Sequence, residues 1–335
     1  MQAVVLAGGL GTRLRPVTLT RPKPLLPVLN RPLVCRVMDL LPPQVDEVFV
    51  ATGYMGDRLT EFFAREKGRR RVEVVVEKSP LGTGGALRNI RDRMKGRFFV
   101  LNGDVICSLD LRRMLRYHEQ KGGLATISLW DIEDPTAYGM VVLDRDGRIV
   151  SFKEKPRREE VVSRAVNAGT YILEPDILGC MEPGREISIE REVFPSVLAR
   201  GLFGFRFEGH WFDAGTLASY LRIHAFLLND LRGGMGKGRD CNIPRTVAWS
   251  APVLLGDRCS VGERSRLGPR CCLGDRVTLG RGSTVRDTVV HNGATIGDRV
   301  LLEQCLVGEN ARIDDDVLVP PGSIIGDGQQ LELRP

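Results

Sequence analysis

Short apolar runs alternate with stretches of helical periodicity from the start of the chain to about residue 228. Apolar runs bounded by turn-forming residues are typical of strands, whereas apolar residues spaced by three and four positions are typical of amphipathic helices. The alternation predicts an α/β domain. Its expected strands are 2–6, 47–51, 72–76, 98–101, 125–130 and 139–143, and its expected helices are 34–41, 57–66, 84–92 and 110–120.

A different period begins at Val253. From there an aliphatic residue recurs every six positions, with two five-residue steps, and a glycine follows many of these residues. The series is Leu255, Val261, Leu267, Leu273, Leu279, Val285, Val290, Ile296, Leu302, Val307, Ile313, Val319 and Ile325. Hexapeptide repeats of this kind predict a parallel β-helix in which each strand buries one aliphatic side chain, with three strands and roughly 18 residues in each coil.

These two patterns, together with the length of 335 residues, predict two domains and a connection. Residues 1–228 would form the α/β domain and residues 246–335 the β-helix. The segment 229–245 between them is rich in glycine, with Gly233, Gly234, Gly236 and Gly238, and is expected to be a flexible linker.

Composition narrows the class of protein. Apolar residues make up 42% and charged residues 27%, which is typical of a soluble globular protein. The net charge of +6 comes without a basic block interleaved with aromatics, so we expect no nucleic-acid partner. No apolar run approaches the length of about 20 residues that spans a membrane, and the chain opens directly into a predicted strand, which leaves no room for a signal peptide. The eight cysteines form no C-x-x-C pair and are expected to be reduced and buried. We therefore expect a cytoplasmic protein with no membrane partner.

A glycine-rich loop follows the first predicted strand, in the run Gly8-Gly9-Leu10-Gly11-Thr12-Arg13. Glycines allow the backbone to come close to a ligand, and consecutive amide N–H groups form an anion-binding concavity. Positive charge in the same segment comes from Arg13, Arg15, Arg21 and Lys23. The loop is therefore expected to bind a triphosphate.

Spacing excludes two commoner phosphate loops. A dinucleotide-binding loop needs G-x-G-x-x-G, but Leu14 occupies the position of the third glycine. A Walker loop needs a lysine and then a serine or threonine after its last glycine, and that pattern is missing. The remaining alternative is an ordinary glycine-rich turn with solvated arginines. The R-x-x-P and K-P-x-x-P patterns that follow the glycines favour a functional loop.

Asp104 follows the predicted strand 98–101 directly, in the run Leu101-Asn102-Gly103-Asp104. Ligands of parallel α/β sheets bind beyond the carboxyl ends of the strands, where the glycine-rich loop also lies. A carboxylate in that place is a natural ligand for Mg²⁺. The alternative is a plain turn residue.

The loop motif Gly8-Gly9-x-Gly11-Thr12-Arg13-Leu14-x-Pro16, followed by Lys23-Pro24-x-x-Pro27, resembles the signature of the sugar-1-phosphate nucleotidylyltransferases. Later segments extend the resemblance over nearly the whole chain. The runs SIEREVFP at 188–195, NAGTY at 167–171 and WFDAGT at 211–216 are most similar to mannose-1-phosphate guanylyltransferases. The resemblance implies a Rossmann-like mixed-sheet nucleotidyltransferase domain followed by a left-handed parallel β-helix.

The resemblance also implies the roles of individual residues. Nucleotide-binding residues would be Leu6, Gly8, Gly9, Gly11, Thr12 and Arg13, with Glu77 and the backbone of Gly82 on the base. Sugar-phosphate-binding residues would be Gly139, Glu154, Lys155 and Asn167. Catalytic residues would be Arg13, Lys23, Asp104 and Asp213, of which the two aspartates hold Mg²⁺. Two alternatives stay open: 77–86 as a helix start capped by Thr83, and 152–156 as a solvated edge strand.

The expected reaction is attack of a sugar 1-phosphate oxygen on the α-phosphorus of a nucleoside triphosphate, with pyrophosphate leaving. GTP and mannose 1-phosphate are the expected substrates. Glucose 1-phosphate with dTTP, ATP or UTP, or a cyclitol phosphate, is an alternative pair. A non-catalytic regulatory subunit that binds nucleotide-sugar is an alternative of another class. A third alternative is acyl transfer with His291 as the general base. The plain interpretation of His291 is a histidine exposed in a turn. The open ends of the β-helix predict a homo-oligomer.

Overall fold

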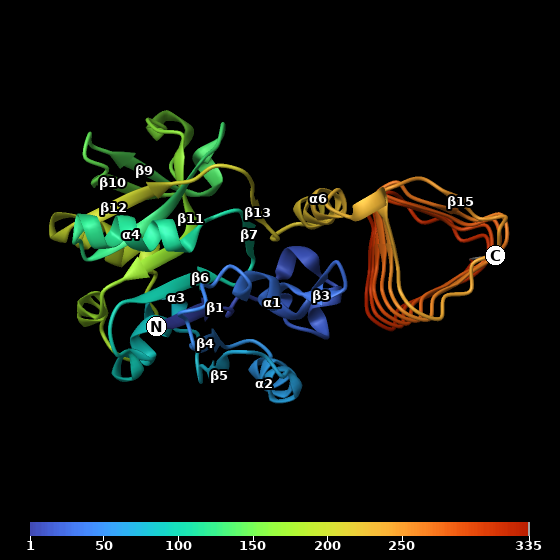
Figure 1. Cartoon of the computed structure of the whole chain (residues 1–335), viewed down its shortest axis with the longest axis horizontal. Coiled ribbons are helices and arrows are strands. Elements are labelled where there is room, and N and C mark those ends of the chain that lie inside the picture. Colours follow the sequence, from blue (N-terminus) through green and yellow to red (C-terminus); the bar gives the residue numbers. More distant parts are fainter. Residues whose placement is uncertain (334–335) are drawn as a thin grey trace. The chain divides into compact units, whose positions relative to one another are not determined.

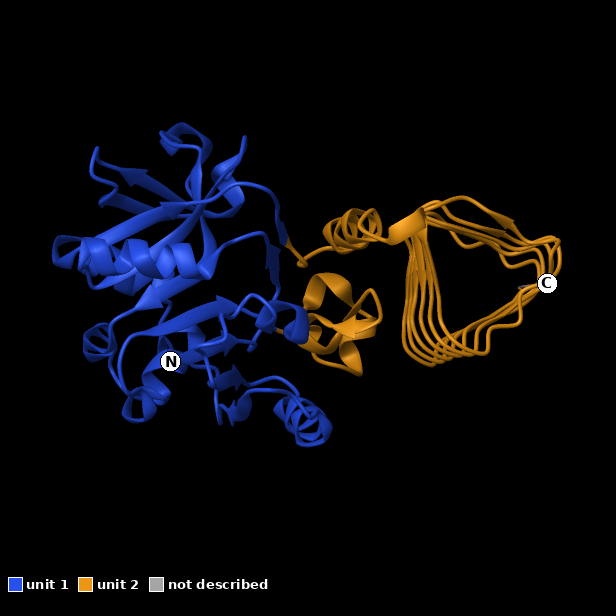
Figure 2. Cartoon of the chain, in the orientation of Figure 1, with its two compact units in different colours: residues 1–9, 34–212 blue, residues 10–33, 213–335 orange. Residues whose placement is uncertain are grey.

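The structure is a computed structural model that describes residues 1–333. Contacts group the chain into two compact units (Figure 2), one of Met1–Gly9 and Val34–Phe212 and the other of Leu10–Leu33 and Asp213–Pro335. We call these the first and second unit, and we call residues 10–33 the signature loop. The grouping differs from the expected domains, because the signature loop belongs with the C-terminal part. The expected boundaries, with one domain ending at residue 228 and a linker ending at residue 245, stay a prediction.

The first unit is built on one mixed β-sheet, as the sequence predicts. The strands follow the order β10-β9-β11-β6-β1-β4-β5, with β8 beside β11 and β12 beside β8. The pairing of β1 with β4 and β6 is parallel, whereas β11 runs antiparallel to β6. Their bounds are β1 Gln2–Leu6, β4 Glu47–Thr52, β5 Arg71–Val76, β6 Phe98–Asn102, β8 Ala125–Asp131, β9 Gly139–Leu143, β10 Ile149–Glu154, β11 Ala165–Leu173 and β12 Leu202–Arg206.

Helices pack against this sheet around a core that includes Val4, Phe98 and Tyr171, which are fully buried. The predicted helices are confirmed as α1 Leu33–Met38, α2 Gly56–Arg65, α3 Gly82–Asn89 and α4 Leu111–Lys121, and a short α5 spans Phe194–Ser196. Particular residues of the sequence determine where α4 begins and ends. The side chain of Asp110 accepts hydrogen bonds from the first turn, and Gly122 closes the helix in the left-handed conformation. A short sheet of β7 (Val105–Cys107) and β13 (Trp211–Asp213) completes the strands of this region.

The C-terminal part is the predicted β-helix, visible as stacked three-sided coils in Figure 1. One face contains β14 Met235–Lys237, β16 Val253–Leu255, β19 Cys271–Leu273, β22 Val289–Val290, β25 Leu306–Val307 and β27 Ile324–Ile325. The second contains β15 Ala248–Trp249, β18 Arg266–Leu267, β21 Thr284–Arg286 and β24 Leu301–Glu303. The third contains β17 Ser260–Val261, β20 Thr278–Leu279, β23 Thr295–Ile296, β26 Arg312–Ile313 and β28 Gln330–Leu331.

The six-residue aliphatic series forms the interior of this β-helix. Leu255 pairs with Leu273 one coil further on, and Leu273 pairs with Val290. These residues and the rest of the series are buried in one continuous core. All pairings between coils are parallel among the described strands. The hexapeptide period therefore fixes both the strands and their stacking.

The glycine-rich segment differs from a fully flexible linker. After α6 (Leu217–Leu228), the residues Met235–Lys237 form β14, which pairs in parallel with β16 as the first strand of its face. Gly236 lies opposite Leu254, and a Cβ atom there would lie 2.7 Å from Leu254 Cδ1. Glycine at position 236 therefore lets β14 pair closely with β16, because a larger residue would collide with the Leu254 side chain.

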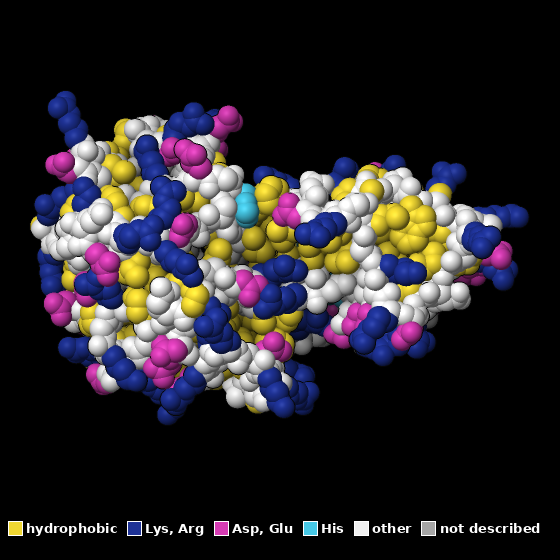
Figure 3. All heavy atoms as spheres, viewed as in Figure 1, with side chains coloured by type: hydrophobic (Ala, Val, Ile, Leu, Met, Phe, Trp, Pro, Cys, Tyr) yellow, Lys and Arg dark blue, Asp and Glu magenta, His cyan; other side chains and the backbone are white. Residues whose placement is uncertain are grey.

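On the face drawn in Figure 3, Lys and Arg side chains are interspersed with Asp and Glu side chains in both units. Among the described residues, no helix has the length and apolar character needed to cross a membrane.

Candidate functional site

The signature loop folds back on itself through three short turns, Thr12–Leu14, Val17–Leu19 and Lys23–Leu25. Gly11 adopts a φ of 61°, and a Cβ atom there would lie 2.9 Å from Cγ2 of Thr18. The Thr18 hydroxyl donates a hydrogen bond of 2.9 Å to the carbonyl oxygen of Gly11. Glycine is therefore needed at this turn, because a larger residue would be strained and would strike the returning chain.

Three of the predicted catalytic residues lie together in the second unit. The ammonium Nζ of Lys23, whose side chain is nearly buried, lies 3.8 Å from Oδ1 of Asp213. A Cβ atom on Gly215 would lie 2.6 Å from Nη2 of Arg13 and 2.9 Å from Oδ1 of Asp213. Arg13 and Asp213 therefore lie beside Gly215, and Lys23 lies beside Asp213. The absence of a side chain at Gly215 leaves room for the guanidinium group.

Arg21 does not share this cluster. Its Nη2 atom forms an ion pair with Glu309 and a second one, at 3.2 Å, with Oδ2 of Asp327. Both acidic residues belong to the β-helix. The expectation that Arg21 adds charge to the phosphate-binding loop therefore differs from the structure, which places this guanidinium between two carboxylates.

The predicted nucleotide-binding residues of the first unit lie at the carboxyl ends of β1 and β6. The backbone N–H of Gly103 donates a 2.8 Å hydrogen bond to the carbonyl oxygen of Leu6. This bond holds the Asn102–Asp104 turn beside the end of β1, where Gly8 and Gly9 are exposed. Leu6, the two glycines and Asp104 therefore share one edge of the sheet, as parallel strand order predicts.

The start of α3 presents Gly82 and Glu77. Gly82 has a φ of 68°, and a Cβ atom there would lie 2.5 Å from the carbonyl oxygen of Ile187, so this position requires glycine. The Oε2 atom of Glu77 accepts a 3.2 Å hydrogen bond from the backbone of Leu81. Burial raises the pKa of Glu77 from its ordinary value, and the hydrogen bond opposes that rise.

Thr83 is not the helix cap that was the alternative for this segment. It lies inside α3, and its hydroxyl donates a 2.6 Å hydrogen bond to Oε2 of Glu190 while accepting one from the backbone of Ile189. Thr83 therefore ties the glycine-rich helix start to residues 188–195.

The predicted sugar-binding residues gather around β9, β10 and β11. Gly139 lies opposite Glu154 in the β9–β10 pair, and a Cβ atom on Gly139 would lie 2.8 Å from Oε2 of Glu154. Burial first, and then the charge of Glu190, raises the pKa of Glu154, while Lys155 and Arg191 lower it. These four charges are therefore close enough to influence one another. Because β10 is the edge strand of the sheet, the edge-strand alternative for 152–156 describes the same segment.

Asn167 sits in an irregular stretch of β11, where the pairing with β8 shifts register between Asn167 and Tyr171. Its Nδ2 atom donates a 2.8 Å hydrogen bond to the Tyr171 hydroxyl, and its Oδ1 atom accepts a 2.9 Å bond from the backbone of Gly169. Bulges of this kind redirect side chains next to functional sites. Here the bulge fixes the orientation of the Asn167 amide.

Glu190 is a residue that the sequence analysis missed. Its carboxylate accepts hydrogen bonds from the hydroxyls of Thr83, Ser188 and Tyr171, at 2.6, 2.9 and 3.3 Å. It lies in a π-helical turn, Ile189–Val193, a conformation that is frequent at functional sites. The only sequence signal was the run SIEREVFP, which carried the family resemblance but no role for this residue. Asn102 was also missed. Its Oδ1 atom is buried and accepts no hydrogen bond from the described residues.

His291 is buried rather than exposed, so the turn-histidine interpretation is wrong. Its side chain is 1% exposed, and its Nε2 atom lies 3.3 Å from the Tyr220 hydroxyl of α6. Burial lowers the pKa of His291 well below the ordinary value, and the nearby Arg21 and His224 lower it further. An imidazole packed in this way is not open to an acyl donor, which argues against the acyltransferase alternative.

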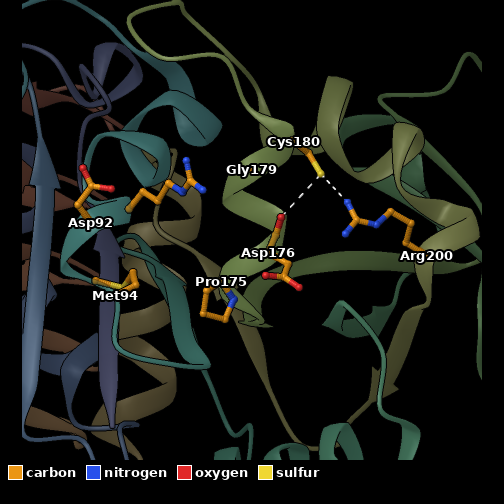
Figure 4. Close-up of a pocket in the computed structure, with 8 residues that line it drawn as sticks. Asp92, Met94, Pro175, Asp176, Gly179, Cys180 and Arg200 are labelled. Carbon is orange, nitrogen blue, oxygen red and sulfur yellow. Dashed lines mark hydrogen bonds between the residues drawn. The ribbon is translucent and has the colours of Figure 1, made fainter.

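A separate pocket of the first unit contains none of the predicted site residues (Figure 4). Its lining includes Arg91, Asp176, Cys180 and Arg200. The Nη1 atom of Arg200 donates a hydrogen bond of 2.9 Å to Sγ of Cys180. Cys180 is exposed, so the expectation that all cysteines are buried is wrong at this position.

Known protein families match both parts of the chain. A family model described as nucleotidyl transferase matches residues 2–230, and one described as GMPPB C-terminal domain matches residues 249–333. The chain is 36% identical to the mannose-1-phosphate guanylyltransferase catalytic subunit beta of Danio rerio, over 98% of this chain and 91% of that protein. It is also 36% identical to the mannose-1-phosphate guanyltransferase of Schizosaccharomyces pombe, over 97% of this chain and 95% of that protein.

Among solved structures, HddC from Yersinia pseudotuberculosis complexed with GMP-PN is 29% identical. It matches 66% of this chain and 97% of that chain, with a TM-score of 0.57. The first family model covers more than half of the residues, and the relatives match over almost the whole length. The chain therefore belongs to the nucleotidyl transferase family of enzymes.

Proposed function

We propose that this protein transfers a guanylyl group from GTP to mannose 1-phosphate, giving a nucleotide-sugar and releasing pyrophosphate. The observation that carries this proposal is that Arg13 and Lys23 of the signature loop lie beside Gly215 and Asp213, respectively, in the second unit. The names of the Danio rerio and Schizosaccharomyces pombe relatives support the substrate pair. The GMP-PN complex of the Yersinia relative supports a guanine nucleotide.

The proposed reaction needs charge neutralisation more than it needs a base. The attacking phosphate oxygen is already an anion, so no side chain has to remove a proton from it. Catalysis of phosphoryl transfer comes from alignment of the reactants and from cations that balance the charge developing on the phosphorus. Arg13 and Lys23 would supply those cations. Because Lys23 lies between Pro22 and Pro24 and its side chain is nearly buried, its ammonium is held in place before the substrate arrives.

We propose Asp104 and Asp213 as ligands of Mg²⁺. Members of this family generally use a divalent metal ion. Among residues 1–333 there is no group of three or more His, Cys, Asp or Glu side chains that could hold a metal. Mg²⁺ is commonly held by one or two carboxylates together with substrate phosphates, so a donor set of aspartate oxygens fits this ion. When bound, it would neutralise charge on the phosphates.

Glu77 is proposed to select the base. A carboxylate is an acceptor only, and guanine presents two neighbouring donors, N1–H and the 2-amino group, whereas adenine presents an acceptor at N1. The hydrogen bond from Leu81 holds the Glu77 carboxylate in position. A guanine base would therefore satisfy this carboxylate, and an adenine base would leave it unpaired at a cost of about 1–3 kcal/mol.

The sugar phosphate is proposed to bind near Gly139, Glu154, Lys155 and Asn167. The hydrogen bonds to Tyr171 and from Gly169 use part of the capacity of the Asn167 amide, which leaves one N–H donor and one acceptor lone pair for a hydroxyl. A polyol needs such donors and acceptors, since each buried hydroxyl left unpaired costs about 1–3 kcal/mol. Lys155 would supply the charge opposite the sugar phosphate.

A pyrophosphate-release screen tests the substrate pair. GTP, ATP, UTP and dTTP are combined with mannose 1-phosphate and glucose 1-phosphate in the presence of Mg²⁺. The expected result is the highest kcat/KM for GTP with mannose 1-phosphate. A higher value for another pair would replace the proposed substrates. Nucleotide-sugar binding without turnover of any pair would favour the regulatory-subunit alternative.

We also propose a cytoplasmic homo-oligomer. All eight cysteines are free, as expected where thiols are kept reduced. In the β-helix, β24, β27 and β28 are end strands of their sheets, and an end strand offers an edge on which a second copy can pair. Light scattering after size-exclusion chromatography should give a multiple of the monomer mass, and a monomer mass would contradict this proposal.

A further inference from the structure

The signature loop is attached to the rest of the second unit at several points away from the proposed catalytic cluster. Nδ2 of Asn30 donates a 2.9 Å hydrogen bond to the carbonyl oxygen of Leu273. The carbonyl oxygen of Pro27 accepts a hydrogen bond from the Tyr220 hydroxyl. At the other end of the loop, Thr20 and Arg21 contact Asp327 and Glu309. The loop is therefore held by the β-helix and by α6 on both sides of Lys23.

The acidic contacts belong to a regular feature of the β-helix that we call the corner ladder, formed by residues 257, 275, 292, 309 and 327. At the steps from 257 to 275, from 275 to 292 and from 309 to 327, a side-chain oxygen accepts the backbone N–H of the residue one coil earlier. The backbone N–H of Asp257 donates to Oδ1 of Asp275 and that of Asp275 to Oδ1 of Asn292, both at 2.8 Å, and the backbone N–H of Glu309 donates to Oδ1 of Asp327 at 2.7 Å. Hydrogen bonds of this kind connect neighbouring coils, so the side chains of Asp275, Asn292 and Asp327 have a structural role at this corner.

The last two members of the corner ladder also face the signature loop. Asp327 uses Oδ1 for the ladder and Oδ2 for the loop, accepting a 2.6 Å hydrogen bond from the Thr20 hydroxyl and pairing with Arg21 at 3.2 Å. Position 309 carries glutamate instead of the aspartate or asparagine found at 257, 275, 292 and 327, and its longer side chain reaches Arg21. The chemistry of the corner therefore changes at the coils where the loop lies.

These ion pairs are shielded from solvent. The side chains of Arg21, Glu309 and Asp327 are 19%, 32% and 12% exposed. Removing one partner from such a group leaves a charge that is only partly solvated, so the loss is larger than for an exposed surface pair. We call these three residues the clasp.

The clasp is close in sequence to the proposed catalytic cluster. Pro22 alone separates Arg21 from Lys23, and Pro24 follows. Because proline fixes φ, this segment has little freedom to absorb a movement of Arg21. A shift of Arg21 would therefore move the Lys23 ammonium relative to Asp213, which lies 3.8 Å away.

We propose that Arg21 is a positioning residue, and that its ion pairs with Glu309 and Asp327 let the β-helix hold Lys23 in place for nucleotide binding. Arg21 is then not a phosphate ligand. The inference rests on the proposed function, because it takes Lys23 as a contact of the triphosphate. It gives the C-terminal β-helix a direct part in the affinity for the nucleotide.

Single variants of the full-length protein test the clasp. E309Q and D327N remove one charge each while keeping the size of the side chain. The matched control is D316N, which removes the carboxylate from the Arg299–Asp316 ion pair elsewhere on the β-helix. We expect KM for GTP to rise by about tenfold in E309Q and D327N, with a smaller change in kcat and a melting temperature like that of D316N, since small displacements of an aligned group have large effects. The charge-exchanged pair R21E with E309R should recover part of the loss seen in R21E.

Two kinetic or binding outcomes would overturn the inference, and so would one outcome of hydrogen exchange. One is an unchanged KM for GTP in both E309Q and D327N. The other is a loss of nucleotide binding in R21Q while E309Q and D327N bind normally, which would make Arg21 a phosphate ligand. Hydrogen exchange of residues 17–26 separates the clasp from the proposed function. Faster exchange in E309Q than in D316N supports the clasp even if the wild type turns over no substrate, and equal exchange contradicts it.

Discussion

The residues proposed for the base and the sugar are held in a different way from those proposed for the triphosphate. In the first unit, Glu77, Glu154 and Asn167 lie on or directly after strands of one sheet, and their neighbours bond to them locally. In the second unit, Arg13 and Lys23 lie in a loop of short turns whose partners are far away in the sequence. The sheet thus fixes one group of residues, whereas the other depends on distant parts of the chain.

This difference predicts where substitutions act. Changes around the sheet should alter selectivity or local stability near the changed residue. Changes in the β-helix should reach the triphosphate through the signature loop, although they lie about 300 residues away in the sequence.

The largest effect is expected for the signature loop itself. Lys23→Ala removes the nearly buried ammonium beside Asp213, and we expect kcat/KM to fall on the order of 10³-fold because a cation that balances transition-state charge is lost. Steady-state pyrophosphate release measures this. Arg145→Ala, an exposed arginine of the turn between β9 and β10, is the control and should keep wild-type turnover. Activity within a few fold of wild type in Lys23→Ala would remove Lys23 from the proposed mechanism.

Base selection tests the sheet-supported group. Glu77→Gln replaces the charged acceptor, and we expect the preference for GTP over ATP to fall by about 100-fold, since hydrogen bonds to charged groups contribute up to about 3 kcal/mol. Competition assays with the two nucleotides give the ratio. The effect should lie in the affinity for GTP, with little change in the KM for mannose 1-phosphate. An unchanged preference would mean that another residue recognises the base.

Backbone conformation at the start of α3 tests how tightly the first unit is fixed. Gly82→Ala places a methyl group 2.5 Å from a carbonyl oxygen at a φ of 68°. We expect the free energy of unfolding to fall by about 1–3 kcal/mol, measured by urea denaturation. Gly68→Ala, where a Cβ atom would meet nothing within 4 Å, is the matched control and should change stability little. Equal stability of the two variants would show that α3 can shift away from Ile187.

The smallest expected effect is a shift of pH dependence. Burial and the charge of Glu190 raise the pKa of Glu154, so its carboxylate becomes protonated at a higher pH than an ordinary glutamate. Binding of the sugar phosphate should therefore weaken as the pH falls through that raised pKa, above the ordinary value of 4.5. Glu190→Gln removes the neighbouring charge, so the acid limb of kcat/KM for mannose 1-phosphate should move to lower pH. A limb that stays in place would mean that Glu154 does not control it.

Sequence patterns were enough to predict those parts of the fold that depend on local periodicity. The strands of the sheet and the coils of the β-helix follow from apolar runs and from the six-residue repeat, because each position in them has the same surroundings as its equivalents. The structure groups Arg13, Lys23 and Asp213, and their catalytic roles, which the family resemblance implies, stay a prediction. The positions of the strands and coils could be predicted from residues close in the chain, whereas the contact of the loop with Asp213 could not.

Contacts between distant segments could not be predicted in this way. Glu190 accepts hydrogen bonds from the hydroxyls of Thr83 and Tyr171 because a π-helical turn directs its carboxylate toward them. Arg21 forms an ion pair with Glu309, which is far away in the sequence, and the Tyr220 hydroxyl of α6 lies next to the buried His291. No periodicity of charged or polar residues marks such pairs, so only the folded chain reveals them.

The most direct test of the proposed reaction follows the phosphorus atoms. Phosphorus NMR of the wild-type protein with GTP, mannose 1-phosphate and Mg²⁺ should show nucleotide-sugar and pyrophosphate appearing in equal amounts, and neither product with Lys23→Ala on the same timescale. Release of GDP and inorganic phosphate, or equal product formation by Lys23→Ala, would contradict guanylyl transfer by this loop.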